Sequence, residues 1–294
     1  MADFLDAYSI QRWLESCPQS YLMNTVYGHA PDEKEPEILL ENDVLREDAI
    51  RVTCQLVAGE RCALLASSGL VGCAPDEASQ RFLATQTLDE ARHVEIFTQR
   101  LYDLGVRKED LEATIAHHVN PNLKRFAEVL LEKVAARDFI AGVVGQNVVL
   151  EGMAFSVFEM LYATNAAANP KFGHVLRGTI ADERRHVGFG ENRIGQLIAQ
   201  HPEKKPAVER MQKEMSWWML ATFADSFQQA NSTLTAFEEA GGERDQEATF
   251  HGVSIGEMEP SEMEHLLSDT ILADFRSRLT RIGIEYQTPD RPGA

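Results

Sequence analysis

Residues 89–93 read DEARH, and residues 182–186 read DERRH. Around both segments the apolar residues recur every three or four positions, which is the period of a helix and not of a strand. In a helix, residues three apart lie on one face, so each segment presents a glutamate and a histidine side by side. The repeat therefore predicts an all-α protein in which two similar Glu-x-x-His pairs are available to bind metal.

The short motif is a weak signal by itself, because Glu-x-x-His arises easily by chance. Residues 261–265, SEMEH, also contain it, as Glu262 and His265. No apolar helix with a lone glutamate precedes this third copy at a matching distance. We therefore expect it to be an ordinary helix surface.

The two repeated segments differ from the third in their context. Each follows an apolar helix with one glutamate, Glu60 in CQLVAGERCALL and Glu151 in NVVLEGMAF. The separations are 30 residues from Glu60 to Glu90 and 32 from Glu151 to Glu183. Two antiparallel helices joined by a short loop bring such residues level. The predicted metal ligands are Glu60, Glu90, His93, Glu151, Glu183 and His186.

Four carboxylates and two imidazoles from four helices are the ligand set of carboxylate-bridged two-metal sites in bundle cores. The four negative charges offset the charge of two ferrous ions. The same carboxylates buried without metal would be costly. We therefore expect a pair of Fe ions, with a mixed Mn/Fe centre as an alternative.

The order of these residues resembles the ferritin-like di-iron carboxylate oxidases and oxygenases, which include ribonucleotide reductase small subunits, multicomponent monooxygenase hydroxylases and acyl-carrier-protein desaturases. The resemblance covers about residues 43–200. It implies a ferritin-like four-helix bundle, with additional N- and C-terminal helices outside it. It also implies that Glu90 and Glu183 bridge the two ions.

The resemblance further implies roles for the residues that flank the ligands. A ligating histidine usually donates its other ring N–H to a carboxylate, which orients the ring. In this family the aspartate of one half serves the histidine of the other, so Asp89 is expected beside His186 and Asp182 beside His93. The arginines of the same two segments, Arg92 and Arg185, are expected to compensate these aspartates.

Cap and turn residues give the expected boundaries. We expect one domain over 1–294, with the bundle core at about 43–200 and extra helices at about 206–281. Asp76 is expected to cap the helix at 77–105, and Asn169 the helix at 170–200. The predicted helices are 9–16, 43–69, 77–105, 108–117, 121–164 with a break near Asp138, 170–200, 206–230 and 261–281. The connection 240–260 is long enough to form a lid.

The composition restricts the partners. With 46 acidic and 28 basic residues the formal charge is −18, which repels nucleic acid and anionic lipid surfaces. The N-terminus has no basic region followed by an apolar run, and the four cysteines form no Cys-x-x-Cys pair. No stretch approaches the roughly 18 consecutive apolar residues of a membrane-spanning helix, so we expect none to span a bilayer. We therefore expect a cytoplasmic protein with reduced thiols, at Cys17, Cys54, Cys62 and Cys73.

The resemblance also provides tests for individual subfamilies at particular positions. Phe97 stands where ribonucleotide reductase small subunits have their radical tyrosine. Cys62 and Gln146 stand where ligand-binding oxidases have the valine and tyrosine of an ether crosslink. Thr179 replaces the extra histidine of N-oxygenases, and Phe155 replaces the threonine of multicomponent hydroxylases. No named subfamily matches at every position.

Helical spacing around the ligands selects pocket residues. Among them, Thr179 and Asn147 are the catalytic candidates, because a small polar group one turn from a ligand can orient bound water or oxygen. The full set is Leu64, Ser67, Gln86, Phe97, Asn147, Phe155 and Thr179.

These observations favour an O2-dependent di-iron oxygenase that oxidises a small organic molecule. Each O2 requires two external electrons, and the sequence has neither a G-x-G-x-x-G before a helix nor a cysteine cluster for an Fe–S centre. A separate reductase or ferredoxin is therefore expected, and a homodimer is one expected assembly. The alternatives are iron storage of ferritin or rubrerythrin type, and a ligand-binding di-metal oxidase acting on a fatty-acid-like substrate.

Overall fold

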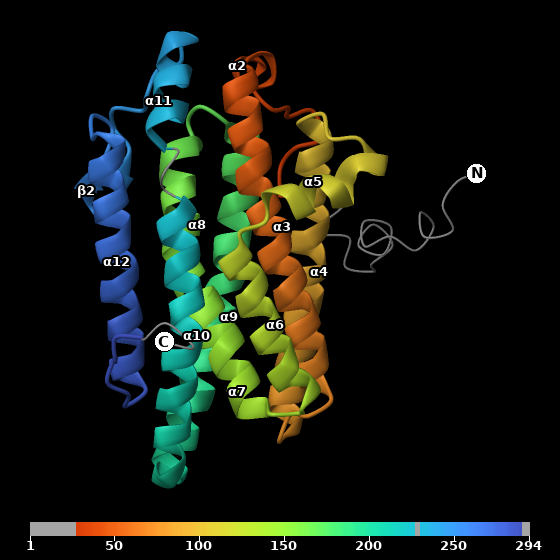
Figure 1. The fold of residues 1–294 in the computed structure, drawn as a ribbon, viewed down its shortest axis with the longest axis vertical. Coiled ribbons are helices and arrows are strands. Elements are labelled where there is room, and N and C mark those ends of the chain that lie inside the picture. The colour runs from red at the N-terminus through yellow and green to blue at the C-terminus, as the bar shows by residue number, and fades with distance from the viewer. Residues whose placement is uncertain (1–27, 227–229, 290–294) are drawn as a thin grey trace.

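Helices run side by side along the length of the molecule (Figure 1). The computed structural model describes residues 28–226 and 230–289, so the predicted helix at 9–16 and Cys17 lie outside the described residues. Two helical hairpins pack together: α3 (Asp43–Val71) with α4 (Glu77–Asp103), and α8 (Glu151–Asn165) with α9 (Pro170–Gln200). This is the expected all-α bundle, and it brings residues about 90 positions apart to the same level.

Side-chain caps determine where these helices begin. The Asn42 side chain accepts hydrogen bonds from two backbone N–H groups at the start of α3. Asp76 accepts from the N–H of Ser79 at 2.8 Å, and Asn169 accepts from the N–H of Phe172 at 3.1 Å. Each cap satisfies backbone donors that have no partner inside the helix. The predicted starts of α3, α4 and α9 are therefore confirmed.

The long apolar segment predicted as one helix consists of four pieces. They are α6 (Pro121–Ala135), α7 (Phe139–Val143), a π-helical segment η3 (Val144–Leu150) and α8. The expected break is present, because the Asp138 side chain caps α7 by accepting from the N–H of Ala141 at 3.0 Å. The π segment ends directly before Glu151 and widens the helix next to this predicted ligand.

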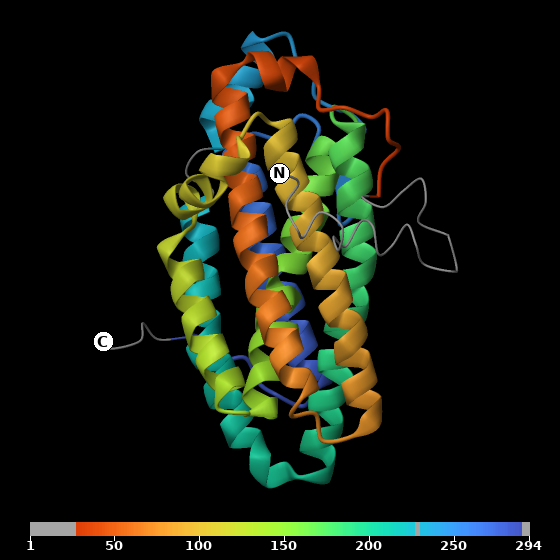
Figure 2. The same cartoon turned by 90° about the vertical axis from the view of Figure 1, so that its right-hand side faces the viewer.

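Further helices cover the bundle on one side, as Figures 1 and 2 show. They are α10 (Lys205–Ser226), α11 (Ala230–Glu239) and α12 (Pro260–Arg281). Helix α11 packs against α3 and α12, while α12 also packs against α8. The other elements are α2 (Glu37–Glu41), η2 (Lys108–Asp110), α5 (Leu111–His118), η4 (Pro202–Lys204) and the antiparallel hairpin β1 (Thr249–Phe250) and β2 (Val253–Ser254).

Four of these elements were absent from the sequence prediction: α2, η4, α11 and the β1–β2 hairpin. All four are short, and their stability comes from packing against the bundle more than from local sequence preference. The hairpin lies within the connection predicted as a lid. Its Phe250 is 2% exposed and belongs to the main apolar core.

The third Glu-x-x-His copy has a local role at the start of α12. The Glu262 side chain accepts from the backbone N–H of Glu259, and the two residues form a capping box. His265 is exposed, and its ring lies 2.6 Å from the backbone oxygen of Ser261. The segment therefore lies on an ordinary helix surface, as expected, and it also caps the start of α12.

The segment Phe139–Asn165 is long and apolar enough to cross a membrane by length and composition. Its most apolar window has a mean hydropathy of 1.4, and 83% of that window is buried inside the protein. A helix that other helices surround must be apolar on nearly every face. Burial in the bundle therefore accounts for its composition.

Candidate metal centre

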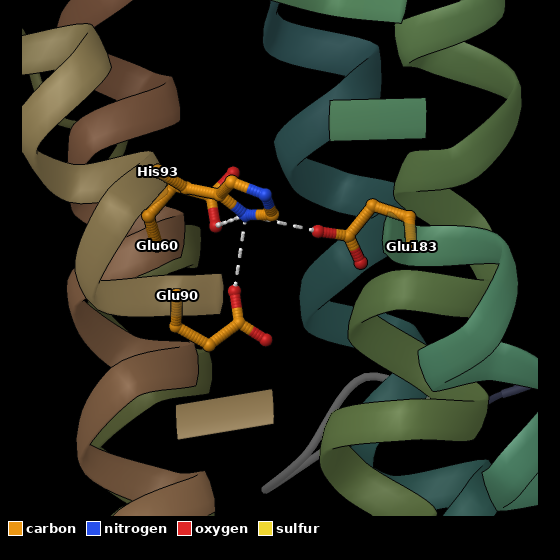
Figure 3. Close-up of side chains that lie close together, drawn as sticks. All are labelled: Glu60, Glu90, His93 and Glu183. Atoms are coloured by element: carbon orange, nitrogen blue, oxygen red, sulfur yellow. Dashed lines mark hydrogen bonds and ion pairs between the residues drawn. The ribbon is translucent and has the colours of Figure 1, made fainter. Parts of the chain in front are cut away.

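Four predicted ligands converge in the middle of the bundle and form the first cluster (Figure 3). They come from three helices: Glu60 from α3, Glu90 and His93 from α4, and Glu183 from α9. The Nδ1 atom of His93 lies 3.3 Å from Glu60 Oε2, 3.3 Å from Glu90 Oε2 and 3.4 Å from Glu183 Oε1. All four residues are buried, so the cluster is shielded from bulk water.

The second cluster lies beside the first and consists of Glu90, Glu151 and His186. The Nδ1 atom of His186 lies 3.3 Å from Glu90 Oε1 and 3.8 Å from Glu151 Oε1. Glu183 also reaches it, with Oε2 at 3.5 Å. All six predicted ligands therefore gather at one place.

Glu90 and Glu183 belong to both halves of this site. Each directs one carboxylate oxygen toward His93 and the other toward His186, whose ring centroids are 6.4 Å apart. This is the geometry expected of carboxylates that bridge two metal ions.

The donor atoms of the site fit a pair of cations. Three of them, Glu90 Oε2, Glu183 Oε2 and His186 Nδ1, are buried and have no hydrogen-bond partner in the described chain. Buried polar atoms without partners are unusual, and unpaired carboxylates are more costly than neutral groups. Carboxylate oxygen and imidazole nitrogen together suit divalent iron and manganese. The residues therefore fit the two-metal group that the sequence predicts.

Burial and mutual repulsion alter the pKa values of the site. Burial, followed by the charge of Glu183, raises the pKa of Glu90 to about 7 and that of Glu151 well above its usual range. Burial lowers the pKa of His186, but the hydrogen bond to Asp89 and the nearby Glu183 carboxylate outweigh it and raise the pKa to about 11. The metal-free site therefore holds protons that cations must displace on binding.

Each histidine has its second ring nitrogen paired with an aspartate from the other hairpin. His93 Nε2 lies 3.1 Å from Asp182 Oδ2, and His186 Nε2 lies 3.2 Å from Asp89 Oδ2. Both cross-pairs were predicted, and both are confirmed. With Nε2 occupied in this way, Nδ1 of each ring is left facing the cluster.

The arginines of the two repeated segments neutralise these aspartates. Arg92 donates to Asp182 across the α4–α9 seam. Arg185 donates to Asp89 at 2.9 Å and to Asp182 at 2.7 Å. Burial raises the pKa of Asp182, but the hydrogen bond from His93 and the charge of Arg92 outweigh it and lower the pKa. Asp182 therefore remains ionised and able to accept from the imidazole of His93.

The two catalytic candidates occupy different surroundings. The Asn147 side chain lies among the ligands, where Nδ2 donates to Glu151 Oε2 at 2.9 Å. Thr179 is buried one turn before Glu183, but its hydroxyl donates to the backbone oxygen of Val175 at 3.2 Å. Asn147 therefore contacts a predicted ligand, whereas the Thr179 hydroxyl is engaged within its own helix.

A cavity of about 500 Å³ opens next to the clusters and is bordered by Glu60, Glu151 and Glu183. Apolar side chains form most of its wall, and they come from α3, α8, α10, α11 and α12. Helices outside the four-helix bundle therefore close the cavity.

The cavity does not coincide with the predicted pocket residues. None of the seven residues chosen by helical spacing, Leu64, Ser67, Gln86, Phe97, Asn147, Phe155 and Thr179, lines this cavity. Spacing from a ligand identifies its neighbours along one helix, but it does not tell which side of the bundle a later helix covers. Gly59 and Ala63, which do line the cavity, are small residues with no chemical signal in the sequence.

No protein-family model matches the sequence, and no curated protein matches it. Solved structures do. A variant of the R2-like ligand-binding oxidase with an anaerobically reconstituted Mn/Fe cofactor is 17% identical, covers 96% of this chain and 98% of its own, and has a TM-score of 0.68. The fold is ferritin-like.

Two other matches agree with this fold. Another R2-like ligand-binding oxidase variant with a Mn/Fe cofactor is 18% identical over 80% of this chain and 81% of its own, with a TM-score of 0.64. A Synechococcus protein with aldehyde deformylating oxidase activity is 19% identical over 84% of this chain and 94% of its own, with a TM-score of 0.59. At these identities the ferritin-like fold is what the structures share with this chain.

Proposed function

We propose that this ferritin-like protein is an O2-activating di-metal oxidase that acts on an elongated, largely apolar organic molecule. The observation that carries the proposal is the contact between the cavity and three of the predicted ligands, Glu60, Glu151 and Glu183. A substrate in the cavity would lie directly against the metal centre. Oxygen chemistry and substrate would then meet in a space that bulk water does not fill.

The arrangement of the clusters suggests how two ions would be divided among the ligands. Glu60 and His93 would hold the first ion, and Glu151 and His186 the second, with both bridged by the shared glutamates. Two reduced ions, as Fe/Fe or Mn/Fe, supply electrons to dioxygen when bound. Carboxylate–imidazole ligation is compatible with either pair.

The protein supplies orientation and an apolar environment. Asp89 and Asp182 hold the two imidazoles in one tautomer, with Nδ1 directed at the ions. Asn147 is proposed to orient a small molecule or a ligand at the second ion, since its amide lies within the site. Thr179 is a weaker proposal, because its hydroxyl is bonded within α9.

The dimensions of the cavity favour an elongated substrate. Its volume is within the usual range for small-molecule sites. The residues of α3 that line it extend from Leu45 to Ala63, which corresponds to about 27 Å along a helix. A fatty-acid-like chain fits this shape better than a compact polar molecule does. An elongated apolar molecule is therefore the substrate class that we propose for the di-metal oxidase.

The remaining parts of the proposal concern partners. We propose an external reductase or ferredoxin as electron donor, a cytoplasmic location and a homodimer as one assembly. Iron storage is the competing function, and it predicts many more than two irons per chain. The apolar cavity next to the ligands favours catalysis over storage, because storage needs no organic binding site.

The test combines metal content with oxygen consumption. The protein is loaded anaerobically with Fe(II), or with Mn(II) and Fe(II) together, and metal per chain is measured by elemental analysis. Exposure to O2 should give oxygen uptake and a transient visible absorbance. The Glu183→Ala variant, which loses a bridging carboxylate, should show neither. Two ions bound with no oxygen uptake would refute the oxidase proposal, and tens of irons per chain would favour storage.

A further inference from the structure

Three buried carboxamides surround the side chain of Glu151; we call them the carboxamide cage, and they are Gln86, Gln146 and Asn147. Gln86 Nε2 lies 2.7 Å and Gln146 Nε2 lies 3.3 Å from Glu151 Oε1, while Asn147 Nδ2 lies 2.9 Å from Glu151 Oε2. All three side chains are 0% exposed. Both oxygens of this carboxylate are therefore held by N–H donors that come from two different elements.

The amide orientations in the cage follow from Glu151. Once ionised, the Glu151 carboxylate only accepts hydrogen bonds, so each amide turns its NH2 group toward it. As a result Gln146 Oε1 and Asn147 Oδ1 are buried without partners in the part of the chain that the structure describes. Leaving these acceptors unpaired is unfavourable. The cage is therefore arranged around the carboxylate at the expense of its own hydrogen bonding.

The π segment explains how two consecutive residues reach one side chain. The backbone N–H of Glu151 donates to the oxygen of Gln146, a bond across five residues in place of the usual four. This wider turn lets the side chains four and five positions before Glu151 lie over it together. A close approach by α9 is possible because Gly190 has no side chain: a Cβ there would lie 2.5 Å from Asn147 Cβ.

The cage contacts the second cluster. Its only contact with a member of the first cluster, among the described residues, is with Glu90, which both clusters share. Gln86 Nε2 lies 3.2 Å from Glu90 Oε1, and Asn147 Nδ2 lies 3.2 Å from the backbone oxygen of His186. Each member of the second cluster therefore has a cage contact. In the first cluster, among the described residues, no carboxamide is hydrogen-bonded to Glu60, His93 or Glu183.

We propose that the carboxamide cage positions Glu151 for the second metal ion and makes the affinity of that site depend on Gln86, Gln146 and Asn147. This inference rests on the proposed two-metal function. Neutral amides suit this role because they stabilise a buried carboxylate without adding a positive charge that would repel the cation. The three act as positioning residues, since their contacts are with protein ligands.

The test is a stepwise anaerobic titration with Mn(II) alone, in which free Mn(II) is followed by electron paramagnetic resonance. The Gln86→Met variant keeps the length of the side chain but removes its donors. We expect its first equivalent of Mn(II) to bind as in the unaltered protein and its second to bind about 10- to 100-fold more weakly, as losses of outer hydrogen bonds to metal ligands usually do. If the cage served folding alone, the substitution would weaken both equivalents of Mn(II) alike.

Matched variants complete the design. Gln212 is also 0% exposed and donates to Ser216 Oγ at 2.9 Å within α10, so Gln212→Met removes a buried carboxamide without touching either cluster. Both equivalents should bind normally in this control. Asn147→Ala serves as a second cage variant if Gln86→Met does not fold, and it adds no bulk beside Gly190.

The outcomes separate this inference from the proposed function. If the unaltered protein binds two ions and the cage variants bind both with unchanged affinity, or lose both equally, the cage proposal is wrong and the two-metal proposal stands. If the unaltered protein binds fewer than two ions, the proposed function itself fails.

Discussion

Gly59 offers a direct test of the cavity. It lines the cavity next to Glu60, and a Cβ at this position would have no neighbour within 4 Å. The Cβ of a Gly59→Leu side chain would therefore meet no protein atom, and we expect the side chain to occupy part of the cavity. Because glycine disfavours helix by about 1 kcal/mol, the substitution should also stabilise α3.

The magnitude follows from the space that the new side chain takes. A leucine side chain adds four carbons, and a buried ligand methylene contributes roughly 0.8 kcal/mol. Excluding about four methylenes of a bound chain should cost about 3 kcal/mol, which weakens binding roughly 100-fold. Metal binding should not change, because Glu60 keeps its position in α3.

The assay is calorimetric titration of the metal-loaded protein with a medium-chain fatty acid, together with elemental analysis and thermal unfolding. Gly178→Leu is the matched control: Gly178 also has open space around its Cβ position, but it lies in α9 and does not line the cavity. Unchanged fatty-acid affinity in Gly59→Leu, or an equal loss in Gly178→Leu, would contradict the assignment of this cavity as the substrate site.

Three further outcomes are expected at the metal centre. Asp182→Asn in α9 removes the carboxylate that orients His93 and should weaken the binding of the first ion about 10- to 100-fold, as measured by chelator competition. The control Asp103→Asn, at the end of α4, removes a carboxylate that pairs with Lys171 and should not change metal binding. The metal-free protein should lose stability as pH rises from 5 to 8, because the pKa of Glu90 is raised to about 7 when folded and that of His186 to about 11, so the folded state holds protons that the unfolded state releases. Thermal unfolding should show a weaker pH dependence once metal is bound; equal slopes would contradict this reading of the site. Removal of metal by a chelator should lower the free energy of unfolding by about 3 kcal/mol when metal had been present at 100 times its Kd, and an unchanged melting temperature would show that the ions do not stabilise the fold.

Much of the metal centre could be predicted because its determinants are local. A Glu-x-x-His pair lies on one face of any helix, so Glu90 with His93 and Glu183 with His186 needed only a helical pattern. Helix starts were equally accessible, since Asp76 and Asn169 cap through their own side chains. The cross-pairing of aspartates and histidines was also predicted, through the resemblance to ferritin-like oxidases.

The sequence by itself therefore determined the all-α pattern, the six converging ligands and the principal helix boundaries. Only the tertiary structure decided where the cavity lies, because α10, α11 and α12 close it from outside the bundle and nothing in the spacing of the ligands specifies which side they cover. It also decided the role of Gln86 and Gln146, whose amides meet Glu151 from separate elements. Periodicity reports contacts within one helix, whereas both of these features depend on contacts between segments far apart in the chain.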